Sequence, residues 1–173
     1  LGARIGADVP YCILGGTALA EGIGEKLTDL AVPPDCTVLL AKPPVNVSTK
    51  LVYQALDALE EWKHPDIDGV ISGIASGNLE KMAASMGNVL EQVTIPQYPV
   101  IEELKQVMKE YGALNAMMSG SGPTVFGLYT EKRQAQKARD QIRSLGLARQ
   151  VYVAGMQKNR RNERNGKQFW SED

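Results

Sequence analysis

The spacing of apolar and polar residues predicts a small β unit near the start of the chain. An apolar run covers residues 11–14, and two strand-like stretches, 17–21 and 26–30, follow it. These two stretches flank Gly22-Ile23-Gly24, a composition typical of a hairpin turn. Pro33-Pro34-Asp35 can continue neither a helix nor a strand, so we expect this unit to end near Pro33.

Beyond that point the pattern alternates between strand-like and helix-like segments. Short branched runs predict strands at 37–41, 113–119, 124–129 and 150–154. Apolar positions at helical spacing predict a helix that begins at Ser48 or Thr49 and ends near Lys63, and further helices at 69–77, 79–86, 99–111 and 131–145. This order favours an α+β fold in which antiparallel strands carry helices on one face.

Composition narrows the class of protein. Of the 173 residues, 43% are hydrophobic and 23% are charged, which is ordinary for a globular chain with a sizeable core. Nineteen basic residues against twenty acidic ones give a formal charge of −1, which argues against nucleic acid or a membrane surface as a partner. No stretch has the length of a membrane span or the order of a signal peptide, and Cys12 and Cys36 are too few for a disulfide framework. These features predict a cytoplasmic protein.

The last part of the chain and the single histidine suggest no chemistry of their own. Residues 157–167 contain no apolar side chain, so 157–173 is predicted to be a basic flexible tail, with an RNA-contacting arm as the less favoured alternative. His64 has no cluster of metal-ligating residues around it in the sequence, and we predict no metal site.

Two short motifs could carry chemistry. In the first, Gly120-Ser121-Gly122 separates two apolar strands, and its glycines could turn backbone amides toward an anion such as a phosphate. A plain glycine-rich hairpin is the alternative. In the second, Gly6-Ala7-Asp8-Val9-Pro10, the proline should hold Val9 extended and so fix the Asp8 carboxylate where it could accept a hydrogen bond from a substrate hydroxyl. A turn in which Asp8 bonds nearby backbone amides is the alternative.

These two motifs, in this order, resemble the GHMP kinase superfamily. The Gly-Ser-Gly loop is similar to the superfamily's third motif. The stretch Ile5-Gly6-Ala7-Asp8-Val9-Pro10 is similar to the branch that acts on diphosphocytidyl-methylerythritol, as is the following Gly16-Thr17-Ala18-Leu19-Ala20-Glu21-Gly22-Ile23-Gly24-Glu25. The resemblance extends from Leu1 to about Met156.

The resemblance implies a role for each of these residues. Asp8 would be the catalytic carboxylate in the transfer of a phosphoryl group from ATP, with Mg²⁺, to the small-molecule substrate cytidine-diphosphate methylerythritol. Gly120, Ser121 and Gly122 would support the phosphates and the substrate. The segment around Thr49 and Tyr53 resembles the part of the family that forms one side of the cytidine pocket, Thr49 through a polar contact and Tyr53 through its ring. For Tyr53, packing on the core is the alternative.

Several of the family's other parts have no counterpart in this sequence. Its principal ATP loop, a glycine- and serine-rich segment that opens a helix, is absent, as is the lysine that partners the catalytic aspartate. The resemblance therefore implies an incomplete kinase that is inactive alone.

The implied organisation has three parts. Residues 1–31 would end the N-terminal α/β domain, residues 35–156 would form a ferredoxin-like C-terminal domain, and the tail would follow. Two rival functions remain: another GHMP kinase, of the homoserine or mevalonate type, and a non-catalytic ferredoxin-like binding module.

Overall fold

The computed structural model of the chain describes residue 6 and residues 9–156. Asp8 and the basic segment 157–173 lie outside the described residues. In the described part, no helix is long and apolar enough to cross a membrane.

A short helix and a two-stranded hairpin come first. Helix α1 covers Val9–Leu14, and strands β1 (Ala18–Glu21) and β2 (Lys26–Asp29) pair antiparallel. In the turn between the strands, the Ile23 N–H donates to Glu25 Oε2 at 2.7 Å, so a side chain stabilises the turn. The predicted hairpin is confirmed.

Two expectations for the residues before this hairpin are wrong. Val9 is helical rather than extended, and residues 11–14 belong to α1 rather than to the β unit. The proline that follows Val9 lies in the first turn of α1. A proline is tolerated there because its missing N–H would have no acceptor inside the helix.

The centre of the molecule is a four-stranded antiparallel sheet. Its strands are β3 (Thr37–Lys42), β4 (Asn115–Met118), β5 (Val125–Tyr129) and β6 (Gln150–Gly155), in the spatial order β4-β5-β3-β6. The central strand β3 pairs with both β5 and β6, and β4 forms one edge. With helices between β3 and β4 and between β5 and β6, this is the ferredoxin-like arrangement that we expected.

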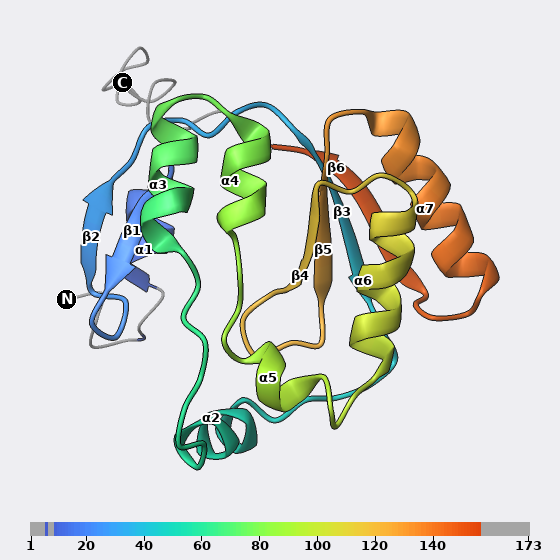
Figure 1. Cartoon of the computed structure of the whole chain (residues 1–173), viewed down its shortest axis with the longest axis horizontal. Helices are drawn as coiled ribbons and strands as arrows, with labels where there is room; N and C mark the ends of the chain where they lie inside the picture. Colours follow the sequence, from blue (N-terminus) through green and yellow to red (C-terminus); the bar gives the residue numbers. More distant parts are fainter. Residues whose placement is uncertain (1–5, 7–8, 157–173) are drawn as a thin grey trace, which may run out of the picture.

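Helices cover both faces of this sheet, which corrects the expectation of helices on one face. The helices of this part are α2 (Thr49–Asp57), α3 (Ile67–Ala75), α4 (Leu79–Ser85), α5 (Glu91–Thr94), α6 (Val100–Glu110) and α7 (Lys132–Ser144). Figure 1 shows α6 and α7 side by side on one side of the sheet, and α3 and α4 on the other side, next to the β1–β2 hairpin.

The alternation of side chains along the strands explains this cover. Neighbouring residues of a strand point to opposite faces, so Leu39 and Tyr129 point to one face while Val38 and Leu128 point to the other. Leu39 and Tyr129 belong to the main core cluster with residues of α6 and α7, and Val38 and Leu128 belong to a second cluster with residues of α3 and α4. Both faces are apolar, so each needs a cover.

Tyr129 shows how completely the first face is covered. Its ring is fully buried, and its hydroxyl donates to the Met108 carbonyl oxygen of α6 at 3.1 Å. Burial raises the pKa of the Tyr129 hydroxyl well above its ordinary value, because the apolar surroundings disfavour the phenolate.

One helix boundary and one whole helix also differ from expectation. Helix α2 ends at Asp57 rather than near Lys63. The acidic pair Glu60-Glu61 would have lain at the negative end of a longer helix, where negative charge is unfavourable. Helix α5 was not predicted at all.

Candidate functional site

The Gly-Ser-Gly loop joins the edge strand β4 to β5 by a tight turn. Gly120 has φ +56° and Gly122 has φ +88°, values that side chains rarely tolerate and that glycine adopts at little cost. The Ser119 N–H donates to the Thr124 carbonyl at 2.8 Å, and the Gly122 N–H donates to the Ser119 carbonyl at 3.0 Å. The loop is therefore a defined turn rather than an open excursion.

The structure brings this loop together with the start of α2. Thr49 Oγ1 and Ser121 Oγ lie 2.8 Å apart in a hydrogen bond, although the two residues are 72 positions apart in the sequence. Thr49 is the first residue of α2, and Ser48 occupies the N-cap position without a side-chain capping bond. Two segments to which the resemblance assigned different parts of one substrate site are thus in contact.

Tyr53 follows Thr49 by one helical turn, so the two side chains lie on the same face of α2. The Tyr53 side chain is 52% exposed, whereas Val52 and Leu56 form the buried face of the helix. Packing of Tyr53 in the core is therefore not what the structure shows. An exposed ring beside Thr49 is free to stack on a base.

Two residues that sequence reasoning missed support the Gly-Ser-Gly loop. The Asn88 amide donates to the Met118 carbonyl at 2.9 Å and to the Gly120 carbonyl at 2.7 Å. Glu91 Oε1 accepts the Met118 N–H at 2.6 Å. An available signal was Asn88 shortly before Glu91, a polar residue and then an acidic one in the manner of a helix start.

The described residues contain no cluster of metal-ligating side chains. Among residue 6 and residues 9–156, no three His, Cys, Asp or Glu side chains come together to hold an ion. The Mg²⁺ that the resemblance implies has no ligand set in this part of the chain.

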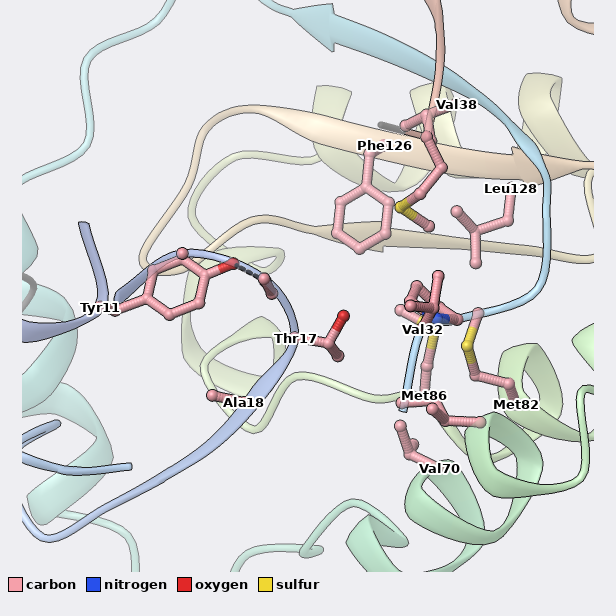
Figure 2. A pocket seen from close by; sticks show the side chains of 15 residues that line it. Tyr11, Thr17, Ala18, Val32, Val38, Val70, Met82, Met86, Phe126 and Leu128 are labelled. Atoms are coloured by element: carbon pink, nitrogen blue, oxygen red, sulfur yellow. Dashed lines mark hydrogen bonds between the residues drawn. The ribbon is translucent and has the colours of Figure 1, made fainter. Parts of the chain in front are cut away.

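A cavity of about 630 Å³ lies away from these residues. Figure 2 shows it between Phe126 and Leu128 of the sheet, Met82 and Met86 of the α4 region, and Thr17 near the hairpin. The described residues that line it include no Asp, Glu, His, Lys or Arg, so they offer it no carboxylate or imidazole to move a proton. None of the predicted site residues that the structure describes, Thr49, Tyr53 and Gly120–Gly122, lines it.

A comparison with models of protein families indicates the class of protein. A family model described as GHMP kinases C terminal matches residues 70–147, which include most of α3, all of α4, α5, α6 and α7, and the β4–β5 turn. With the ferredoxin-like sheet and the Gly-Ser-Gly turn, this match shows that residues 70–147 belong to the C-terminal part of the GHMP kinase family.

Comparisons with individual proteins find relatives that are named as one particular kinase. Over 153 residues the chain is 59% identical to the 4-diphosphocytidyl-2-C-methyl-D-erythritol kinase of Lachnospira eligens, an alignment that covers 88% of this chain and 53% of the relative. It is similar to a crystal structure of 4-(cytidine 5'-diphospho)-2C-methyl-D-erythritol kinase, with a TM-score of 0.72, 29% identity, and coverage of 88% of this chain and 54% of that one.

A homoserine kinase from Cytophaga hutchinsonii shares the fold at 23% identity and a TM-score of 0.68, over 86% of this chain and 49% of that one. Identity this low shows the fold alone. The chain spans about half the length of the curated relatives it matches.

Proposed function

We propose that this chain is the C-terminal part of a kinase that transfers the γ-phosphoryl group of ATP to the 2-hydroxyl of 4-diphosphocytidyl-2-C-methyl-D-erythritol. Residues 1–31 would then end its N-terminal domain, and residues 35–156 would form its C-terminal domain. The observation that carries this proposal is the Thr49–Ser121 hydrogen bond, because it joins the segment proposed for cytidine to the loop proposed for phosphate. The 59% identity to a kinase of that name supports the same substrate.

Each proposed site residue has a chemical task. Asp8 would orient or deprotonate the attacking hydroxyl, a contribution that is typically worth about 10²–10⁴-fold in rate. The Gly120–Gly122 turn would present backbone amides to the phosphates, as nests of successive N–H groups do. The exposed ring of Tyr53 would stack on the cytosine.

Magnesium belongs to this proposal through the general chemistry of phosphoryl transfer, in which the ion neutralises charge on the phosphate oxygens. The described residues hold no ligand set for it. The steps that this chain would contribute are therefore positioning and proton transfer.

The test uses the complete kinase, by which we mean the longer protein that we propose to contain this chain. With ATP, it is assayed against diphosphocytidyl-methylerythritol, homoserine and mevalonate in parallel. We expect kcat/KM for the cytidine substrate to exceed the other two by at least about 10³, because a site with hydrogen-bonding groups and a stacking ring rejects substrates that lack the base. Equal or higher turnover of homoserine or mevalonate would transfer the protein to that branch of the superfamily.

The same assay tests Asp8. We expect Asp8→Asn to lower kcat by at least about 10² while ATP affinity changes little, since the amide keeps the shape and loses the charge and basicity. A fall of less than about threefold would return Asp8 to a structural turn. A complete protein that phosphorylates none of the three substrates would favour the non-catalytic module.

A further inference from the structure

Side chains form hydrogen bonds with both the N–H and the carbonyl of Met118, the last residue of β4. Met118 lies on the edge strand of the sheet, and only Ser119 separates it from Gly120 of the Gly-Ser-Gly turn. Its N–H donates to Glu91 and its carbonyl accepts from Asn88. The segment 88–91 therefore takes the place of a neighbouring strand at the point where the loop begins.

Asn88 also reaches into the loop itself, where its amide donates to the Gly120 carbonyl at 2.7 Å. Its Oδ1 accepts the Leu90 N–H at 3.0 Å, so the side chain is held at both of its ends. Both Nδ2 hydrogens and the oxygen of Asn88 are thus committed, and the side chain has one orientation that satisfies all three bonds.

Holding the Gly120 carbonyl sets the direction of the next amide. A peptide unit is planar and trans, so the Gly120 carbonyl and the Ser121 N–H point in opposite directions. The Met118–Ser119 unit shows the same relation, since its carbonyl meets Asn88 while its N–H donates to Thr124. Asn88 therefore directs the Ser121 N–H away from itself, and no described residue accepts that N–H.

Glu91 is held in turn by an ion pair. Lys105 Nζ of α6 lies 2.7 Å from Glu91 Oε2, and the two side chains are only 11% and 17% exposed. Lys105 also lies 3.3 Å from Glu102. The Met118 N–H thus donates to one oxygen of a carboxylate whose other oxygen is paired with an ammonium group. Hydrogen bonds to ionised acceptors are stronger than those to neutral ones. Through the ion pair, the loop is anchored to a helix of the main core.

We propose that Asn88 and Glu91 are positioning residues for phosphoryl transfer, which hold the Gly-Ser-Gly turn so that the Ser121 N–H faces the phosphate. This inference rests on the proposed kinase function. Neither residue touches the reacting atoms; both act through the main chain of residues 118–121. Their removal changes where the loop amides point and leaves the chemistry of Asp8 unaltered.

The chain contains a matched control for Asn88. Asn115 also donates its amide to two backbone carbonyls, those of Ala83 at 2.7 Å and Met86 at 3.1 Å, and its Oδ1 accepts the Ala116 N–H at 2.8 Å. It makes the same set of bonds and is also half-buried, but none of its bonds reaches the loop. Asn88→Ala and Asn115→Ala therefore remove equal numbers of hydrogen bonds.

The experiment measures kcat and KM for ATP in the complete kinase, normalised to folded protein. We expect Asn88→Ala to lower kcat/KM by about 10- to 100-fold. A displacement of a binding group by about 1 Å can lower the rate by up to about 100-fold. At least about threefold of the expected loss should be a rise in KM, which a loss of folded protein cannot produce. Asn115→Ala should change each constant by less than about twofold.

Asn88→Asp provides a second variant if Asn88→Ala does not fold, because it keeps the size and the acceptor oxygen and loses both donors; the same loss is expected. An active kinase in which the Asn88 variants match Asn115→Ala would overturn this inference and leave the proposed function standing. Failure of both Asn88 variants to fold would make the role structural and would overturn it too. An inactive complete kinase would overturn the inference together with the proposed function.

Discussion

At the scale of single residues, Tyr53 bears most directly on the choice of substrate, because only a substrate that carries a base offers a surface for its ring. The ring is 52% exposed and lies one turn from Thr49 on α2. In the complete kinase we expect Tyr53→Ala to raise KM for the cytidine substrate by about 5- to 100-fold, the equivalent of losing about 1–3 kcal/mol of stacking. Tyr53→Phe should change this KM only slightly, because the ring is kept.

Leu51 supplies the control for this prediction. It lies on the same helix and is 61% exposed, but a residue two positions away faces a different side of a helix. Leu51→Ala should leave KM unchanged, and neither truncation should lower Tm by more than a few degrees, since neither creates a cavity. Unchanged KM in Tyr53→Ala would remove Tyr53 from the pocket.

The role of Tyr53 could be argued from the sequence only as one of two alternatives. Both a stacking ring and a core ring fit a helix with apolar residues at Val52 and Leu56. Exposure separates them, and exposure depends on what packs against α2. The same limit applies to Asn88, whose two carbonyl partners lie 30 and 32 residues further along the chain.

At the scale of elements, the contact between α3 and α4 depends on the absence of a side chain. A Cβ at Gly73 of α3 would lie 2.5 Å from the Met82 nitrogen and 2.6 Å from its Cα, both backbone atoms of α4. Backbone cannot rotate aside, so Gly73→Ala should force the helices apart. We expect a loss of about 1–3 kcal/mol in the free energy of unfolding, the usual cost of overpacking, measured by denaturant titration of this chain.

Gly155→Ala is the matched control, because an added Cβ there meets no heavy atom within 4 Å. It should change the free energy of unfolding by less than about 0.5 kcal/mol, as surface substitutions usually do. Equal stability of the two variants would mean that α3 and α4 do not approach each other as closely as the structure shows.

Helices and strands with a clear periodic pattern of apolar residues were predicted well. The elements that were missed have physical explanations. The β1–β2 hairpin and the four strands of the central sheet follow directly from local patterns and turn residues. Helix α5 covers only Glu91–Thr94, which is shorter than one period of a recognisable pattern. The packing of α3 and α4 on the second face of the sheet could not be predicted from local sequence, because these helices contact β3 and β5 only in the folded chain.

The candidate site was predictable in parts but not as a unit. Its motifs were recognised through resemblance, whereas the hydrogen bond between Thr49 and Ser121 joins positions 72 residues apart and has no local signal. The supporting bonds of Asn88 and Glu91 have none either. The side chains that hold this glycine-rich turn come from segments distant in the sequence, so no local pattern around the turn predicts them.

At the scale of the whole molecule, the described residues contain only part of the kinase site that we propose. The Gly-Ser-Gly turn, Thr49 and Tyr53 come from the ferredoxin-like domain. The sequence contains no glycine- and serine-rich loop that opens a helix, which the family uses to bind the ATP phosphates, and the chain spans about half the length of its curated relatives. If the Gly-Ser-Gly turn binds phosphate as we propose, it would do so without the contacts of that loop.

We therefore expect the 173-residue chain alone to show no measurable ATP-dependent phosphorylation of diphosphocytidyl-methylerythritol, under conditions in which the complete kinase turns over readily. Orientation of reacting groups can contribute about 7–11 kcal/mol of a barrier, so a chain without the main phosphate loop forfeits a large share of its rate. Product formation is followed by phosphorus NMR, with folding of the chain checked by its cooperative unfolding. Asp8→Asn in the isolated chain distinguishes genuine turnover from a contaminating host kinase. Phosphorylation by the 173-residue chain that Asp8→Asn abolishes would show that this part holds a sufficient ATP site by itself, and the main loop would then be dispensable.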